Sequence, residues 1–195
     1  VYRPPPEAPG GGAKPPGGSV LIFSTPPTPN GDLHLGHLSG PYLAADVLRR
    51  ALVGAGRTAV HVTGRDDHQT YVALKGRRDG RTETEVADRH AGEILSTLRG
   101  CGVTLDGFIE PARTGGYAEF VRDGVRRLFS DGHVYASARP AAFSKDGRYL
   151  HEAHLRGRCP HCREESDGNA CEACGRPNSC VDLLDPRDRL TGEPV

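Results

Sequence analysis

Two histidines separated by two residues, His34 and His37, follow an apolar segment and open a helical pattern. Residues three apart lie on nearly one face of a helix, so both imidazoles can donate to one anionic group. The helix N-terminus adds free N–H groups and partial positive charge, and Gly36 lets a flat ligand approach the backbone. The pattern fits a turn that binds phosphate and stabilises charge developing on an α-phosphate. Two surface histidines, or a zinc-binding pair, are the alternatives.

Acidic residues follow a second expected strand in the segment Thr63-Gly64-Arg65-Asp66-Asp67-His68. The carboxyl ends of parallel strands meet at one sheet edge, where ligands bind in open α/β folds. Asp66 is therefore expected near the histidine turn, where its carboxylate could pair with a substrate ammonium. An aspartate that caps the next helix is the alternative.

Four cysteines form two C-x-x-C hooks separated by eight residues: Cys159, Cys162, Cys171 and Cys174. Two such hooks can supply four thiolates to one tetrahedral, structural Zn²⁺. Two disulfides or a redox pair are the alternatives, which the missing secretion signal disfavours. His161 is expected to be exposed rather than ligating, Cys180 has a poorer spacing, and Cys101 is expected to be a small buried residue.

The elements that must position these residues follow from periodicity and from start and stop signals. The pattern predicts strands over 19–24 and 58–63, and helices over 36–53, 82–99 and 116–130. Strands alternating with helices predict an α/β fold, here the first half of a Rossmann-like parallel sheet. The last helix is expected to turn one apolar face inward, made of Phe120, Val121, Val125, Leu128 and Phe129.

Composition divides the chain into three parts. Residues 1–18 are dominated by Pro and Gly and predict a disordered leader. Residues 19–135 predict the first half of a nucleotide-binding catalytic domain. Residues 136–195 predict an insertion with a hairpin at Asp146-Gly147 and the four-cysteine zinc knuckle.

Overall charge gives no argument for a nucleic-acid partner, since Lys+Arg and Asp+Glu are both 25 among 195 residues. No apolar run approaches the roughly 20 residues needed to cross a bilayer. A cytoplasmic protein that does not enter a membrane is expected. The chain starts at Val1 and contains no methionine, so we expect a piece of a longer product.

The segment from Pro29 to His37, with Ala44-Ala45-Asp46-Val47 after it, resembles the "HIGH" signature of class I aminoacyl-tRNA synthetases, in their methionyl branch. The resemblance implies that ATP, with Mg²⁺, binds at Asn30, His34, Gly36 and His37. It makes the two histidines catalytic in adenylate formation. It also implies that Asp66 contacts the amino group of the amino acid and that Thr28 lies at its pocket.

The hairpin and knuckle resemble the connective insertion of the same family, which lies close to the acceptor end of tRNA. Three positions depart from the family pattern. Pro26 and Thr28 stand where methionyl enzymes carry an apolar residue and a Tyr, and Gln69 stands where they carry Gly. The resemblance implies methionine as the amino acid, and the departures at Pro26 and Thr28 leave that choice open to test.

Three hypotheses follow. The parent protein is an aminoacyl-tRNA ligase that forms an aminoacyl-adenylate and charges tRNA; or it is a synthetase-like paralogue that activates another amino acid; or the chain is a zinc-knuckle binding module without catalysis. The resemblance implies a second half with a "KMSKS" loop, and no such motif stands in this sequence. We therefore expect the 195-residue piece alone to be inactive in aminoacylation.

Overall fold

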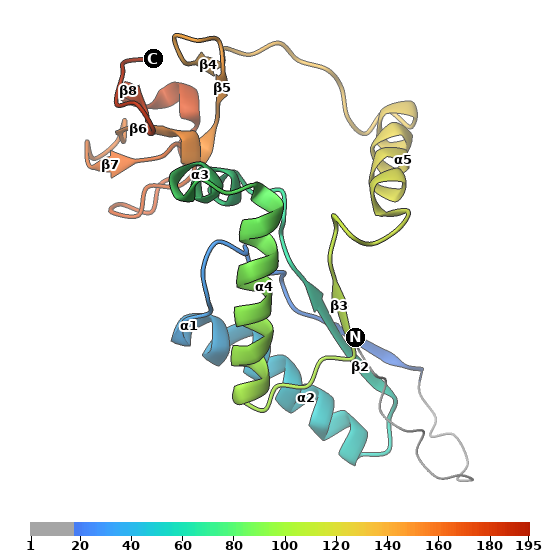
Figure 1. The fold of residues 1–195 in the computed structure, drawn as a ribbon. Helices are drawn as coiled ribbons and strands as arrows, with labels where there is room; N and C mark the ends of the chain where they lie inside the picture. Colours follow the sequence, from blue (N-terminus) through green and yellow to red (C-terminus); the bar gives the residue numbers. More distant parts are fainter. Residues whose placement is uncertain (1–17) are drawn as a thin grey trace. The chain divides into compact units, whose positions relative to one another are not determined.

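The computed structural model describes residues 18–195, which divide into two compact units (Figure 1). The first unit contains residues 18–67 and 83–117, and the second contains residues 68–82 and 118–195. The leader expected at 1–18 lies, apart from Gly18, outside the described residues. The division of the remainder at residue 135 stays a prediction from the sequence.

A parallel three-stranded sheet forms the centre of the first unit. Its strands are β1 (Val20–Phe23), β2 (Ala59–Gly64) and β3 (Gly107–Ile109), in the order β1-β2-β3. Val20 pairs with Ala59, and Val62 pairs with Gly107. The α/β architecture and the first two strands confirm the prediction. Strand β3 was not predicted, because three residues carry too little periodicity to be recognised.

One helical run follows β1, where a helix over 36–53 was predicted. It consists of α1 (Leu35–His37), the π-helical turn η1 (Leu38–Tyr42) and α2 (Leu43–Gly54). Pro41 lies inside η1, and it has no N–H to donate to a helical ladder. Helix α4 (Glu83–Gly100) begins directly after Thr82, as its sequence predicted.

The core of the first unit lies between these helices and the sheet. Its buried side chains are Tyr42, Ile94, Leu98 and Val103, and a second cluster joins Ile22, Ala45 and Ala59. Side chains alternate along β1, so Leu21 and Phe23 face the other side of the sheet. There they are 68% and 60% exposed. The helices of this unit therefore cover one face of the sheet.

The second unit begins with a helix that was not predicted, α3 (Thr70–Asp79). It ends at Gly80, whose φ of 63° is the left-handed conformation of a helix C-cap. The short helix η2 (Glu152–His154) packs against α3. There the Thr70 hydroxyl donates to Glu152 at 3.2 Å and accepts from the Ala153 N–H at 3.4 Å. Two segments far apart in the sequence are thus joined.

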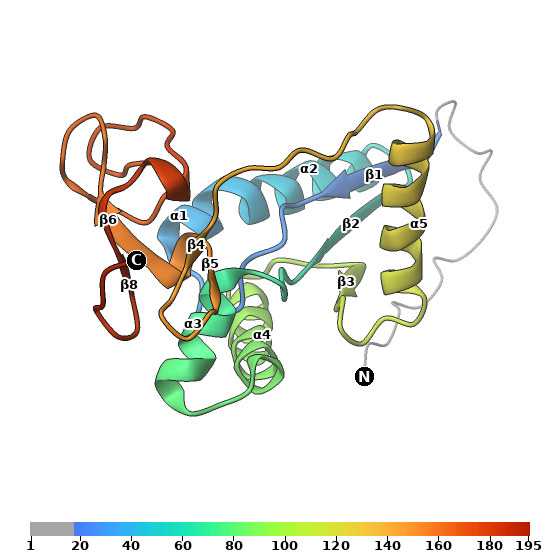
Figure 2. The same cartoon turned by 90° about the horizontal axis from the view of Figure 1, so that it is seen from above.

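Short antiparallel strands lie between residues 142 and 188 of this unit (Figure 2). Strands β4 (Ala142–Phe143) and β5 (Tyr149–Leu150) form the hairpin predicted at Asp146-Gly147. A second sheet has the order β7-β6-β8, with β6 (Leu155–Arg158), β7 (Glu165–Ser166) and β8 (Leu184–Asp188). Helix η3 (Cys180–Asp182) precedes β8. The core joins Leu150, Leu155, Cys180 and Leu183.

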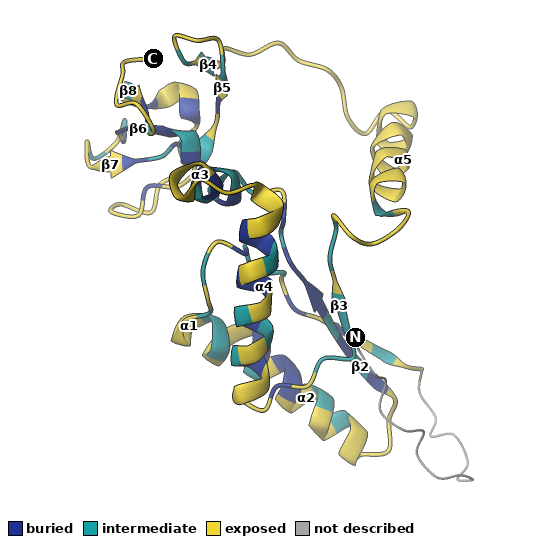
Figure 3. Cartoon of the chain, viewed as in Figure 1, coloured by how far each residue is buried: buried dark blue, intermediate teal, exposed yellow. Residues whose placement is uncertain are grey.

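Helix α5 (Tyr117–Ser130) forms where a helix was predicted, but its expected burial is wrong. None of its residues is buried, and Figure 3 shows it exposed along its length. Phe120 is 78% exposed and Phe129 is 51% exposed. An amphipathic pattern predicts that a face has a partner, and the described residues supply none. Among the described residues, no helix is both long and apolar enough to cross a membrane.

Candidate functional site

The two histidines form a reciprocal cap at the start of α1. His34 is the N-cap residue, and its Nδ1 accepts the Gly36 N–H at 3.1 Å. In return, the His34 N–H donates to Nδ1 of His37 at 3.3 Å. The two rings are stacked, with centroids 3.8 Å apart and planes 25° from parallel. The predicted pairing of the side chains on one face is therefore present.

This cap fixes the tautomers of the two rings. Because each Nδ1 accepts an N–H, the proton of a neutral ring must reside on Nε2. Burial lowers the pKa of His37, and the neighbouring His34 charge lowers it further. At neutral pH, His37 is thus a neutral donor through Nε2–H. The turn can present an Nε2–H donor from each ring to an anion.

Gly36 gives the His34 ring the space it occupies. A Cβ at position 36 would lie 3.0 Å from Cε1 and 3.1 Å from Nδ1 of His34. Both distances are shorter than ordinary van der Waals contact, so any side chain here would displace the ring. The sequence indicated that Gly36 gives a ligand access to the backbone, and space for the His34 ring is a second reason for a glycine here.

The turn that leads from β1 to α1 is held at the carboxyl edge of the sheet. The Tyr42 hydroxyl donates to the Thr25 carbonyl at 2.8 Å, and the Asn30 N–H donates to the Thr28 carbonyl at 2.9 Å. The Asp66 N–H donates to the Pro27 carbonyl at 3.0 Å. The structure therefore brings Thr28, Asn30 and Asp66 to the edge at which the histidine turn begins.

Sequence reasoning missed Arg65, the residue that anchors the end of β2. Its side chain is 1% exposed, and its Nε lies 2.8 Å from Asp67. Its Nη1 lies 2.9 Å from Asp88 and 3.3 Å from Glu110. The sequence did offer a signal for this role, since Arg65 lies between a buried strand and two aspartates. This ion-pair cluster fixes the backbone on both sides of Asp66.

The four predicted cysteine ligands converge in the second unit. Their Sγ atoms all lie within 4.8 Å of one another. The Sγ atoms of Cys159 and Cys174 are 3.9 Å apart, and those of Cys162 and Cys171 are 3.5 Å apart. A tetrahedron with Zn–S bonds of about 2.3 Å has edges of about 3.8 Å, whereas a disulfide needs about 2.05 Å. The arrangement fits one metal ion and does not fit two disulfides.

The surroundings of this cluster support thiolate ligands. Burial opposes ionisation of Cys159, but the N–H groups of Cys162 and His161 and the neighbouring thiols outweigh it and lower the Cys159 pKa to about 6. Without a metal ion the first charge opposes a second, so burial and the neighbouring cysteines raise the Cys162 pKa to about 12. A bound cation is what would let all four cysteines ionise together. The His161 side chain is exposed, as expected, and is outside the cluster. Such a closed set of four thiolates stabilises a fold rather than activating water.

The remaining two cysteines stand apart from the metal ligands. Cys180 is buried, and its Sγ accepts the Glu152 N–H at 3.1 Å. Cys101 is exposed, so the expectation that it is buried is wrong. It follows the end of α4, where the turn to Gly102 lies at the surface.

A parallel sheet with a histidine-containing helix start at its carboxyl edge defines an α/β protein of the Rossmann type, and four cysteines of the second unit are arranged as they would be to hold one metal ion. The family model described as tRNA synthetases class I (M) matches residues 20–194. The chain belongs to this family of class I tRNA synthetases.

Curated relatives agree with this membership. The chain is 32% identical over 177 residues to the methionine–tRNA ligase of Thermomicrobium roseum, a match covering 90% of this chain and 30% of that protein. It is also 32% identical over 176 residues to the enzyme of Thermoplasma acidophilum, covering 89% of this chain and 32% of the relative. The chain thus spans about a third of the length of these relatives.

Solved structures share the fold. Methionyl-tRNA synthetase of Mycobacterium tuberculosis, in complex with methionyl-adenylate, superposes with a TM-score of 0.62 at 20% identity. That match covers 82% of this chain and 30% of the other. A ternary complex of Agrobacterium radiobacter K84 LeuRS with tRNA and LeuAMS gives a TM-score of 0.59 at 17% identity, covering 76% and 20%.

Proposed function

We propose that this chain is part of an enzyme that activates an amino acid with ATP and transfers the aminoacyl group to tRNA. The observation that carries the proposal is the reciprocal cap of His34 and His37, which leaves the Nε2–H of each ring available as a donor at a helix start. Family membership supports the same reaction. We place this activity in the cytoplasm.

The proposed chemistry needs charge stabilisation more than covalent catalysis. The carboxylate of the amino acid attacks the α-phosphorus of ATP, bound with Mg²⁺, and pyrophosphate leaves with the electron pair of the broken P–O bond. Negative charge grows on the α-phosphate oxygens at the transition state. Nε2–H donors of His34 and His37 stabilise that charge, because they are oriented before the reaction. Asn30 and Gly36 complete the ATP site.

We assign binding of the amino acid to residues beside this turn. Asp66 would pair with its ammonium group, and Thr28 would line its side-chain pocket. The curated relatives are named methionine–tRNA ligases, so methionine is the proposed substrate. The choice of methionine has to be tested, because Pro26 and Thr28 depart from the residues that methionyl enzymes carry at this pocket.

Zn²⁺ is the proposed ion of the four-cysteine centre. Cys159, Cys162, Cys171 and Cys174 would hold it, and it would supply folding stability to the second unit rather than take part in adenylate formation.

Amino-acid-dependent exchange of pyrophosphate into ATP tests the proposal on the full-length product. Each of the common amino acids is supplied in turn. Exchange that depends on methionine alone supports the methionyl assignment. Exchange with another amino acid instead would contradict methionine and identify a paralogue, whereas exchange with none would overturn the proposed enzyme.

A further inference from the structure

Three polar side chains meet in the core of the first unit, where apolar side chains would be expected. His61 and Thr63 of β2 are fully buried, and Ser24, directly after β1, is 3% exposed. His61 and Thr63 lie on the same face of β2, because the side chains of a strand alternate. Burial of a polar group is costly unless the group is hydrogen-bonded. The hydrogen-bond partners therefore show what these three residues, called the Ser24 cluster below, hold together.

The hydrogen bonds of the Ser24 cluster converge on Ser24. The Thr63 hydroxyl donates to the Ser24 carbonyl at 2.9 Å. The Ser24 Oγ lies 2.8 Å from Nε2 of His61, and it donates to the Pro41 carbonyl at 3.3 Å. The other ring nitrogen of His61, Nδ1, lies 3.2 Å from the Thr104 carbonyl. The cluster thus joins β1 and β2 to η1, the helical turn that continues from α1.

The histidine turn depends on such ties, because α1 buries no side chain of its own. It has only three residues, and a helix of that length is not stable by itself. It continues into η1, where Pro41 has no N–H to donate to the helical ladder. One hydrogen bond attaches η1 to the end of β1 through Ser24 and Pro41, and a second does so through Tyr42. The position of the histidine turn on the sheet therefore depends on these two hydrogen bonds.

The proton on the His61 ring decides whether Ser24 can bind Pro41. Ser24 has one hydroxyl proton, and a carbonyl oxygen can only accept. When Nε2 of His61 carries the ring proton, it donates to Ser24, and the Ser24 proton is available for Pro41. When Nδ1 carries it instead, the ring donates to Thr104, and Nε2 takes the Ser24 proton. The Nε2–H tautomer is therefore the one that ties η1 to the sheet.

We propose that His61 is a positioning residue for adenylate formation, which acts through Ser24 on the histidine turn. His61 is fully buried, so it cannot touch a substrate itself. The inference rests on the proposed function, in which the two histidines of the turn stabilise charge at the transition state. A displacement of about 1 Å can cost such an oriented group roughly 10²-fold in rate. Loss of the link through Ser24 should therefore lower kcat more than it changes KM.

Two substitutions of His61 separate positioning from a structural role. The amide nitrogen of glutamine stands about as far along the side chain as Nε2 of histidine, whereas that of asparagine takes the place of Nδ1. His61→Gln can thus still donate to Ser24, and His61→Asn can serve only Thr104.

Pyrophosphate exchange by the full-length enzyme measures the difference. We expect His61→Asn to lower kcat about tenfold and to change the KM for ATP by less than about twofold. His61→Gln should keep kcat within about threefold of the parent. Equal losses of kcat in the two variants would show that the ring only fills space, and they would overturn the inference.

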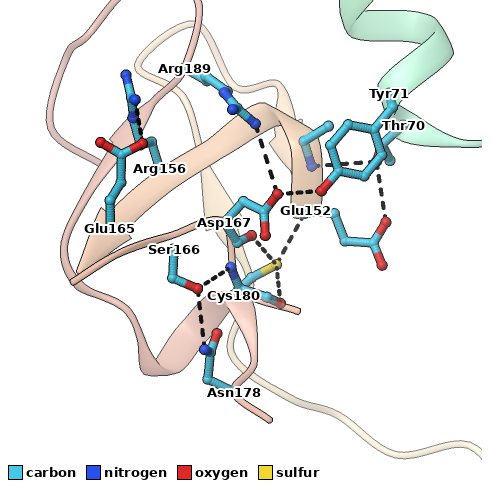
Figure 4. A network of polar contacts seen from close by, with 12 residues as sticks. Thr70, Tyr71, Glu152, Arg156, Glu165, Ser166, Asp167, Asn178, Cys180 and Arg189 are labelled. Atoms are coloured by element: carbon cyan, nitrogen blue, oxygen red, sulfur yellow. Dashed lines mark hydrogen bonds and ion pairs between the residues drawn. The ribbon is translucent and has the colours of Figure 1, made fainter. Parts of the chain in front are cut away.

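Ser24→Ala should lower kcat as His61→Asn does, because it removes the hydrogen bond to Pro41. Ser166→Ala is the matched control in the second unit. Ser166 is 8% exposed, and its Oγ accepts from the side-chain amide of Asn178 at 3.2 Å (Figure 4). Each substitution leaves a hydrogen-bond partner unsatisfied, so the thermal midpoint should fall in both variants. Only Ser24→Ala should lose kcat, and an equal loss in Ser166→Ala would contradict a role specific to the turn.

The backbone amides of the histidine cap test the positioning without any reaction. In the 195-residue chain, His61→Asn should shift the amide resonances of His34 and Gly36, whereas His61→Gln should leave them near the parent values. Unchanged cap resonances in His61→Asn would also overturn the inference. If these resonances respond but the full-length parent shows no exchange, the proposed function fails, and the positioning of the turn by His61 stands.

Discussion

His34 and His37 use one ring nitrogen to hold the turn and leave the other for a ligand. We predict that His34→Ala or His37→Ala lowers the rate of pyrophosphate exchange about 10²- to 10³-fold in the full-length enzyme, the loss typical of one oriented donor to a developing anion. Leu35→Ala is the matched control, because Leu35 lies between them and is 81% exposed. A loss of less than threefold in both histidine variants would contradict a role at the transition state.

The state of His37 gives a prediction about pH. Its pKa is lowered in the folded chain from the ordinary value of 6.5, so the unfolded chain binds its proton first as pH falls. The contribution of the turn to stability is therefore complete above pH 6.5 and is lost as pH falls through the folded pKa. Protonation of Nδ1 would also end its hydrogen bond with the His34 N–H.

NMR titration of the His37 ring checks this sign. The midpoint should lie below that of the same residue in the urea-unfolded chain, and the His34 amide resonance should move with it. A midpoint above the unfolded value would show that the ring is stabilised in its charged form and would contradict the neutral-donor assignment.

Whether the role of a residue could be predicted depends on whether its partners lie close to it in the sequence. The histidine turn and the cysteine hooks were predictable, because spacing alone brings their side chains together. The role of Arg65 was not, since Asp88 and Glu110 reach it only through the fold. The left-handed backbone of Arg163, with φ of 68°, was not predicted either, because an arginine gives no sign of that conformation.

At the scale of elements, long periodic segments were found and short or polar ones were missed. β1, β2, α2 and α4 follow clear apolar patterns. Helix α3 has few apolar residues, and it is held in place by contacts with η2. About eighty residues separate the two helices, so no local window of sequence contains both. The pattern of α5 was read correctly, but its amphipathic face has no partner among the described residues.

This contrast between α4 and α5 predicts opposite stability effects. Ile94→Ala in α4 should lower the free energy of unfolding by about 2–5 kcal/mol, because Ile94 is fully buried in the core of the first unit. Phe120→Ala in α5 should change it by less than about 0.5 kcal/mol, since that ring is 78% exposed. Urea unfolding of both variants measures the difference. A loss above 2 kcal/mol for Phe120→Ala would mean that α5 is packed in solution.

The end of β2 gives a second element-scale prediction. Arg65→Met should destabilise the chain by about 3–5 kcal/mol, because it leaves Asp67 buried and charged without its partner. Arg113→Met is the control, since Arg113 pairs with the same Asp88 at the surface and should cost under about 1 kcal/mol. Equal urea midpoints for the two variants would show that the buried cluster is not what holds this strand end.

At the scale of the whole molecule, each of the two units has its own core among the described residues. Tyr42, Ile94 and Leu98 centre the first, and Leu155 and Leu183 belong to the second. The four cysteines lie in the second unit alone. A structural metal contributes its binding free energy to the folding of the part that holds it. Removal of zinc should therefore affect one unit and spare the other.

We predict two thermal transitions for the zinc-loaded chain, of which a chelator lowers one. Metal analysis of the reduced protein should find one equivalent of zinc, and Cys174→Ser should reduce it to well under half. Cys101→Ser is the control, because Cys101 is exposed and lies in the first unit, and it should keep both the zinc and both transitions. A single transition that moves as a whole on chelation would contradict the independence of the two cores. If metal analysis found no zinc in the parent protein, the proposed metal centre would be wrong. The stability of the second unit would then come from its small apolar core alone.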